Sequence, residues 1–249
     1  RGGRRRRRSE GIEEDLLHKG RASEPKVRLF VTGFSRFAGV PTNPTESLVK
    51  ALELRFNSNG NSNASSKVSK LSLSCDILDV SAKAVSAHLD HVAATLREGD
   101  ADEEEIVILV HFGVDICANS FKIEKQAFNE ANFRIPDEEG WQPTRETIIE
   151  DGETLPIGHC LTTKFDTEEI VRQMKDEGFP VQLSFDAGRY VCNYTYYKSQ
   201  KIFGHREKSY SVFVHVPGFH VIDESTQISF ATRLLDELVA QCVPRACVR

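Results

Sequence analysis

The sequence predicts an α/β fold: a three-layer α/β/α sandwich in which helices cover both faces of a twisted, mostly parallel central sheet. Two observations support this prediction. From residue 27 onward, short runs of β-branched and apolar residues alternate with segments that have helical spacing. In addition, residues 106–110 are Ile-Val-Ile-Leu-Val, a continuous apolar run that is typical of strands buried on both faces in parallel sheets.

The first part of the chain alternates strands with helices. Residues 27–32 are β-branched and apolar for the most part and predict a strand. Residues 45–56 carry apolar residues at helical spacing behind an Asn-Pro pair and a threonine, which is a helix start signal. Residues 57–67 are rich in Asn, Ser and Gly and predict a surface loop. A strand over 71–80 and a helix over 82–97 complete this part.

The middle of the chain contains the buried strand and a long irregular stretch. The buried strand is predicted over 105–112, and a second strand-like stretch covers 121–129. Residues 137–159 are acidic and have no period, which predicts a segment that wraps the surface. A helix over 167–178 and a strand over 181–185 follow.

Three elements close the chain. A helix is predicted over 190–203 behind Gly188, a strand over 211–216 ends in a Pro-Gly pair, and a helix covers 225–242. The last helix has one apolar stripe, formed by Ile228, Phe230, Ala231, Leu234, Leu235 and Leu238. In folds of this kind, functional sites lie beyond the carboxyl ends of the strands.

Composition divides the chain into a basic tail and an acidic body. Six arginines lie within residues 1–8 although the whole chain has a formal net charge of −5. Residues 1–25 have too little apolar surface to fold alone, so we expect a disordered Arg-rich tail before a single domain over 26–249. Nucleic-acid binding needs clustered Lys and Arg on a folded surface, and the acidic body therefore predicts no nucleic-acid partner.

The cysteines and the hydropathy pattern bear on location. Six cysteines (Cys75, Cys117, Cys160, Cys192, Cys242 and Cys247) form no CxxC pair and no metal-ligand spacing, which is typical of a reducing compartment. There is no run of 18 apolar residues and no apolar region of a secretory signal, so no membrane association is expected. We therefore predict a cytoplasmic protein whose oligomeric state the sequence leaves open.

No cofactor or metal is expected. His88 and His91 are three residues apart and His159 precedes Cys160, but no third and fourth ligand has a matching spacing for structural zinc. The phosphate-binding motifs GxxxxGK[ST] and GxGxxG are both missing from the sequence.

Cys192 is the strongest candidate for chemistry. It lies where a predicted strand gives way, through Ala187 and Gly188, to a predicted helix. A cysteine in the first turn of a helix lies near the positive end of the helix dipole, which favours the nucleophilic thiolate. A buried structural cysteine is the alternative interpretation, because free cysteines are often buried.

His215 and Glu124 are the other candidates. His215 lies at the end of an apolar strand, where each ring nitrogen needs a hydrogen-bond partner. The common alternative is a core histidine with both nitrogens hydrogen-bonded and no catalytic role. Glu124 lies in an alternating stretch, where a solvated strand glutamate is the common alternative. Together with Cys192 they supply a nucleophile, a base and a carboxylate that orients the base.

Four ordered blocks between about Val27 and Cys242 carry a family resemblance. They are Val31-Thr-Gly-Phe-Ser-Arg-Phe-Ala-Gly39 with Asn43-Pro44, the stretch from Gly113 through Glu124 to Arg134-Ile-Pro-Asp137, the stretch Ala187-Gly-Arg-Tyr-Val-Cys-Asn193, and Val214-His-Val-Pro217. In order and spacing they resemble the opening, glutamate, nucleophile and histidine motifs of the pyroglutamyl peptidase I family, the pyrrolidone-carboxylate peptidases.

The resemblance implies a cysteine peptidase that hydrolyses the N-terminal pyroglutamyl residue from peptides through a thioacyl-enzyme intermediate. It assigns catalysis to Cys192, His215 and Glu124. It also implies a set of substrate-binding residues, Phe34, Phe37, Asn43, Val114 and Arg134. By this resemblance, Phe34 and Phe37 flank the lactam ring and the main chain of Val114 binds it. Arg134 matches a family arginine that lies beside the site.

Two departures from the family pattern bear on specificity. Ala38-Gly39 replaces a Gly-Gly pair, and residues 114–119 replace a glycine-rich segment, which reduces backbone freedom near the pocket. A related amidase for another N-terminal acyl or lactam group, and a degenerate homologue that only binds peptides, therefore remain alternatives. The segment 137–152 is expected to act as a lid or to decorate the surface.

Overall fold

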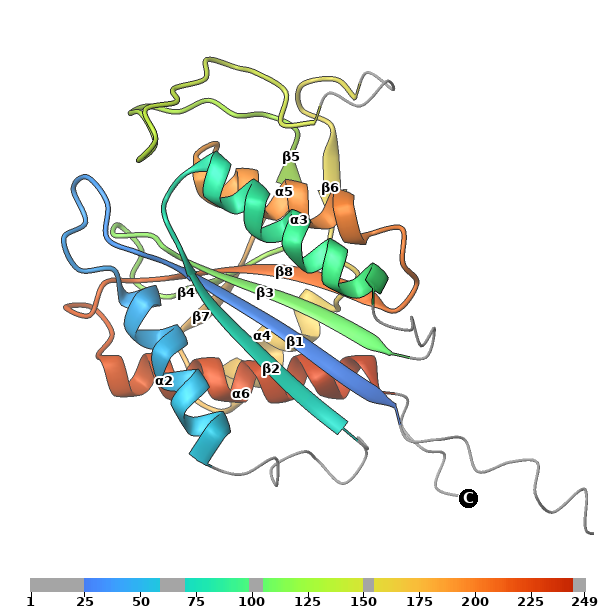
Figure 1. The fold of residues 1–249 in the computed structure, drawn as a ribbon. Coiled ribbons are helices and arrows are strands. Elements are labelled where there is room, and N and C mark those ends of the chain that lie inside the picture. The colour runs from blue at the N-terminus through green and yellow to red at the C-terminus, as the bar shows by residue number, and fades with distance from the viewer. Residues whose placement is uncertain (1–24, 59–69, 99–104, 150–154, 244–249) are drawn as a thin grey trace, which may run out of the picture.

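A six-stranded sheet forms the centre of the molecule (Figure 1). The computed structural model describes residues 25–58, 70–98, 105–149 and 155–243. The strands of this sheet, in chain order, are β1 (Lys26–Phe34), β2 (Lys70–Leu78), β3 (Ile106–Val114), β4 (Phe121–Glu124), β7 (Val181–Ser184) and β8 (Ser209–Val216). They lie in the spatial order β2-β1-β3-β8-β4-β7.

Most neighbouring strands are parallel. β1 pairs in parallel with β2 and β3, β3 with β8, and β4 with β7. Only the pairing of β4 with β8 is antiparallel within this sheet, so β4 and β7 run against the other four strands. The predicted mostly parallel sheet is confirmed.

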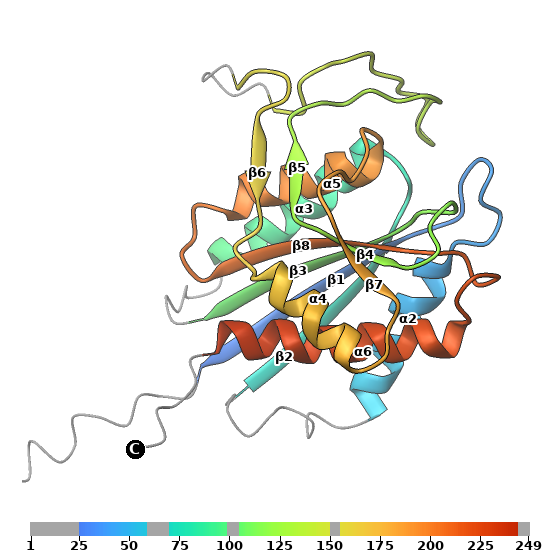
Figure 2. The ribbon, with the colours of Figure 1, turned by 180° about the vertical axis from the view of Figure 1, so that it is seen from behind.

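Helices cover both faces of the sheet. Figure 2 shows α2 (Pro44–Ser58), α4 (Thr167–Asp176) and α6 (Glu224–Cys242) on one face, and α3 (Ala82–Glu98) and α5 (Val191–Phe203) on the other. The three-layer sandwich predicted from the sequence is therefore confirmed.

The strand period decides which side chains meet which helices. Along β8, Val212, Val214 and Val216 pack in the core on the α6 side, whereas Phe213 packs in the core on the α5 side. Successive side chains of a strand point to opposite faces, so His215 lies on the α5 side with Phe213. The α5 face of β8 therefore carries the polar residue at the strand's carboxyl end.

Two local predictions differ from the structure. The predicted loop over 57–67 begins too early, because α2 continues to Ser58; the rest of that loop lies outside the described residues. The strand-like stretch over 121–129 is two strands, because the chain leaves the central sheet after Glu124 and forms β5 (Gln126–Phe128). β5 pairs with β6 (Cys160–Thr162), which the sequence pattern does not predict, in a small antiparallel sheet.

Within the part of the chain that the structure describes, no helix is long and apolar enough to cross a membrane. The predicted tail over 1–25 lies outside the described residues, except for Pro25.

Candidate active site

Cys192 is the second residue of α5 and lies in its first turn. The chain reaches this helix from β7 through a turn in which Gly188 has a φ of +81°, a conformation that favours glycine. Tyr190 caps the helix without a side-chain hydrogen bond. The first-turn N–H groups and the positive end of the helix dipole are therefore directed to the half-buried thiol.

Gly113 forms the floor beneath the thiol. It pairs with His215 across β3 and β8. A Cβ atom at Gly113 would lie 2.6 Å from the Phe213 ring and 3.1 Å from Cys192 Sγ. The missing side chain thus leaves room for both the Phe213 ring and the sulfur.

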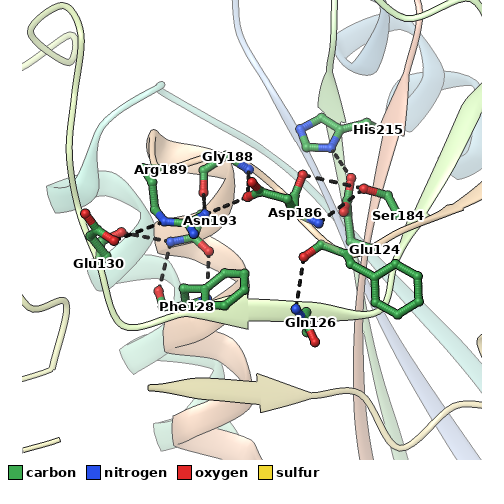
Figure 3. A network of polar contacts seen from close by, with 11 residues as sticks. Glu124, Gln126, Phe128, Glu130, Ser184, Asp186, Gly188, Arg189, Asn193 and His215 are labelled. Carbon is green, nitrogen blue, oxygen red and sulfur yellow. Dashed lines mark hydrogen bonds and ion pairs between the residues drawn. The ribbon is translucent and has the colours of Figure 1, made fainter. Parts of the chain in front are cut away.

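His215 and Glu124 form a buried pair behind the thiol. His215 donates a hydrogen bond from Nδ1 to Glu124 Oε1 over 2.8 Å (Figure 3). Glu124 is 0% exposed, and the Tyr196 hydroxyl on α5 donates to its main-chain carbonyl over 2.9 Å. The carboxylate is therefore not the solvated strand residue of the alternative interpretation, because α5 covers this face of β4.

The electrostatics of His215 favour its protonated form. Burial alone would lower the pKa of this imidazole, but the charge of the Cys192 thiolate, the hydrogen bond with Cys192, and the Glu124 carboxylate raise it to about 10. The site thus places the Cys192 sulfur in contact with His215, which is hydrogen-bonded to the buried Glu124 carboxyl group, and this arrangement suits an acyl-transfer nucleophile.

These residues open onto a cavity of about 720 Å³. Cys192 and His215 line it, whereas Glu124 lies behind His215. The other lining residues include the five predicted to bind substrate, namely Phe34, Phe37, Asn43, Val114 and Arg134. The structure therefore brings all eight predicted site residues to one place.

The five residues differ in how their side chains are used. Phe34 is 3% exposed and forms a wall of the cavity, while Phe37 is half-buried with its ring centroid 6.4 Å from that of Tyr190. Asn43 donates from Nδ2 to the Ser35 carbonyl and accepts at Oδ1 from Thr45. The amide of Asn43 is thus occupied in shaping its own loop.

Arg134 lies on a wall that is firmly attached to the domain. The Asp137 carboxylate accepts from the main-chain N–H of Ala82, at the start of α3, over 2.9 Å. It also accepts from the N–H groups of Glu139 and Trp141. Arg134 is exposed and lines the cavity next to this anchor.

The predicted lid or decoration over 137–152 is described as far as residue 149. Asn129 accepts at Oδ1 from the N–H groups of Ile148 and Ile149, over 2.9 and 3.0 Å. The Trp141 ring packs edge-on against Phe133 at 5.1 Å. The described part of the segment is therefore attached to the domain by hydrogen bonds and ring packing, and none of its described residues lines the cavity.

Asn193 was not predicted to have a role, although it directly follows Cys192. Its side chain accepts from the Phe128 N–H and donates to the carbonyls of Phe128 and Glu130, each over 2.9 Å (Figure 3). Arg189 lies over the Phe128 ring and contacts Glu130. These contacts attach the start of α5 to β5. In the sequence, the signal for Asn193 is its place as the last residue of the motif that contains Cys192.

Among the described residues, no group of three or more His, Cys, Asp or Glu side chains is placed to hold a metal ion.

Comparisons with known proteins agree with this geometry. A family model described as pyroglutamyl peptidase matches residues 27–237. The pyrrolidone-carboxylate peptidase of Thermococcus litoralis is 30% identical over 193 residues, which cover 76% of this chain and 76% of that protein. The corresponding protein of Brevibacillus brevis is 31% identical over 192 residues, covering 76% of this chain and 77% of that protein.

Solved structures show the same fold. A mutant pyrrolidone carboxyl peptidase from Pyrococcus furiosus superposes with a TM-score of 0.69 at 22% identity, covering 86% of this chain and 98% of that one. The enzyme from Fervidobacterium islandicum gives a TM-score of 0.66 at 23% identity, covering 86% and 99%. Because the family model matches most of its length, the chain belongs to the pyroglutamyl peptidase family.

Proposed function

We propose that this protein is a cysteine peptidase that removes the N-terminal pyroglutamyl residue from peptides, with Cys192 as nucleophile, His215 as acid and base, and Glu124 as the group that orients His215. One observation carries the proposal: the first-turn Cys192 contacts a histidine whose other nitrogen is hydrogen-bonded to a buried carboxylate, at the wall of a cavity.

The first half-reaction forms a thioester. The Cys192 thiolate attacks the carbonyl carbon that joins pyroglutamate to the next residue, and the first-turn N–H groups of α5 stabilise the oxyanion. The C–N bond then breaks, and the His215 imidazolium gives its proton to the leaving amine. The raised pKa of His215 keeps this proton in place at neutral pH.

The second half-reaction releases pyroglutamate. His215, now neutral, takes a proton from water, and the resulting hydroxide attacks the thioester carbon. The C–S bond breaks, the thiolate of Cys192 returns, and the imidazolium of His215 is restored. Glu124 stabilises the imidazolium through the 2.8 Å hydrogen bond.

Substrate recognition needs apolar faces and few polar groups, because the pyroglutamyl end is a small neutral lactam. Phe34 and Phe37 supply two aromatic faces on the cavity wall. The main chain of Val114, at the carboxyl end of β3, supplies polar groups for the lactam. Arg134 supports the negative charge that develops near the thiolate.

Hydrolysis of a pyroglutamyl-coumarin substrate tests the function. We expect thiol-sensitive hydrolysis of this substrate, none of the free-glutamyl analogue, and none of the prolyl analogue. Cys192→Ala and His215→Ala should each abolish turnover while the circular dichroism spectrum is kept. Equal rates on the three substrates would show that the protein is a different amidase. A wild-type protein that binds peptides but does not hydrolyse them would be a degenerate binding homologue.

We also propose a cytoplasmic location. Cys75, Cys117, Cys160, Cys192 and Cys242 are free thiols, which suits a reducing compartment. Microscopy of the full chain fused to a fluorescent protein tests the location, and secretion of the fusion would contradict it.

A further inference from the structure

An ion pair between Lys122 and Asp115 lies beside His215 at the cavity. Lys122 Nζ is 2.7 Å from Asp115 Oδ2, and both residues line the cavity with His215. Lys122 pairs directly with His215 across the antiparallel strands β4 and β8. Residues directly opposite in such a pair have their side chains on the same face, so Lys122 and His215 are neighbours there.

Asp115 is held in place by both of its carboxylate oxygens. Oδ2 accepts from Lys122, and Oδ1 accepts from the main-chain N–H of Cys117 over 3.0 Å. The N–H of Asp115 donates to the Val216 carbonyl, one residue beyond His215, over 2.9 Å. The pair is therefore anchored to the strand that carries the base.

The charges that face His215 come from three elements. α5 contributes Cys192, β4 contributes Glu124 and Lys122, and the loop after β3 contributes Asp115. Three further charged residues line the same cavity, namely Arg134, Asp186 and Arg189. Asp186 and Arg189 form their own ion pair.

The charge of His215 acts on Asp115. Burial raises the pKa of the Asp115 carboxyl, but the hydrogen bonds from Lys122 and Cys117 and the charges of Lys122 and His215 lower it below its ordinary value. Asp115 is therefore ionised, and because such coupling is mutual, its charge also acts on His215.

We propose that Lys122 and Asp115 are positioning residues that hold balanced charges beside His215 and thereby set the pH range in which the Cys192–His215 pair is active. The inference rests on the proposed function of that pair. A purely structural role of the ion pair makes a different prediction. In our proposal, the positive charge of Lys122 disfavours the protonated form of His215, and the negative charge of Asp115 favours it.

The two single substitutions are expected to move the pH profile in opposite directions. Lys122→Met leaves the Asp115 carboxylate unbalanced, which stabilises the imidazolium, destabilises the thiolate and moves both limbs of the kcat/KM profile to higher pH. Asp115→Asn leaves the Lys122 ammonium unbalanced and moves both limbs to lower pH. One unbalanced unit charge beside His215, in a partly solvated site, should shift each limb of the pH profile by about half a pH unit to one unit.

The experiment measures pH profiles of kcat/KM on pyroglutamyl-coumarin for wild type, both single variants and the double variant. The double variant should return close to the wild-type profile. Arg233→Met is the control, because Arg233 pairs with Glu177 on the opposite face of the sheet and should leave the profile unchanged. Shifts of the same sign in both single variants, or no shifts at all, would overturn the proposal.

A second measurement separates this proposal from the proposed function. The pH dependence of Cys192 alkylation by iodoacetamide responds to the same charges without any peptide substrate. Opposite shifts in alkylation alone would support the ion-pair proposal even if no pyroglutamyl hydrolysis were found. Hydrolysis with unshifted profiles would refute the ion-pair proposal and leave the function intact.

Discussion

Two buried histidines on the α5 face of the sheet have opposite properties. His111 lies on β3 and is 1% exposed, and His215 lies on the adjacent β8 and is 7% exposed. The Phe213 ring is close to both, with its centroid 6.3 Å from that of His111 and 4.9 Å from that of His215. The two histidines differ in the hydrogen-bond partners of each ring, and His215 lines the cavity whereas His111 does not.

His111 has neutral partners. Its Nδ1 is hydrogen-bonded to the Thr32 hydroxyl over 2.7 Å and its Nε2 to the Ser199 hydroxyl over 3.0 Å. Burial, with a smaller effect of His88, lowers its pKa to about 3. His111 is thus a neutral link between β1, β3 and α5.

His215 has charged partners, and they reverse the effect of burial. The Cys192 thiolate and the Glu124 carboxylate raise its pKa to about 10, although burial acts in the other direction. The comparison teaches that the partners of a buried histidine, rather than its depth, decide whether it can carry a proton in catalysis.

The largest expected effect comes from the same substitution at the two histidines. His215→Gln removes the proton donor and the stabiliser of the thiolate, so kcat/KM on the pyroglutamyl substrate should fall by about 10³-fold or more. His111→Gln puts a neutral, hydrogen-bonding side chain at the other histidine and is the matched control, with an expected change of no more than about threefold. Comparable losses at both positions would show that the two histidines are not functionally distinct.

Glu124→Gln should have the next largest effect, because it makes the partner of His215 neutral. The imidazolium loses stabilisation, so kcat/KM should fall by about 10- to 100-fold and the alkaline limb of the pH profile should move to lower pH. Among the described residues, no donor contacts Glu124 Oε2, so the substitution removes no hydrogen bond at that oxygen. Glu124→Asp keeps the negative charge, so the alkaline limb of its pH profile should stay at the wild-type position. If the alkaline limb does not move in Glu124→Gln, the carboxylate does not stabilise the His215 imidazolium.

Gly113→Ala should have a smaller effect on activity, because it changes the packing beneath the Cys192 thiol rather than a reacting group. The new Cβ would lie 2.6 Å from the Phe213 ring, so we expect a loss of about 1–3 kcal/mol in the free energy of unfolding. Displacement of the Cys192 sulfur should lower kcat/KM by about tenfold. In a Phe213→Leu background, which removes the close ring carbons, the cost of Gly113→Ala should shrink; an equal cost in both backgrounds would exclude this contact as the cause.

Much of this comparison was open to prediction from the sequence. The alternation of elements predicts the layers, and the rule that sites lie beyond the carboxyl ends of strands holds for His215 at the end of β8. It does not account for Cys192, because β7, the strand before Cys192, runs in the opposite direction to β8. The sequence predicts Glu124 as the third catalytic residue but does not predict that its side chain is buried. Strand alternation placed Glu124 with Lys122 on a polar face, and only the packing of α5, through Tyr196, shows that this face is covered.

Other features depend on contacts that a local pattern does not contain. β6 has three residues directly after the acidic stretch over 137–159, too few to show a strand period. The antiparallel pairing of β4 with β8 depends on strand order in space. His111 lay inside a predicted strand, but its partners Thr32 and Ser199 are 79 and 88 residues away along the chain.

The smallest effect on activity, in His111→Gln, should accompany a clear effect on stability. The ordinary pKa of histidine is 6.5 and that of His111 in the fold is about 3, so between these values the unfolded chain binds a proton that the folded chain does not. His111 therefore leaves stability intact above pH 6.5 and lowers it as the pH falls toward 3, by about 1.4 kcal/mol per pH unit.

Urea unfolding of wild type and His111→Gln at pH 7 and pH 4.5 measures this contribution. The free energy of unfolding should fall less on acidification in the variant, by about 2–3 kcal/mol, because the amide does not titrate. His205→Gln, at an exposed histidine, is the control and should leave the difference between the two pH values unchanged. If His111→Gln has the same acid sensitivity as wild type, His111 is not the neutral buried histidine that the contrast with His215 requires.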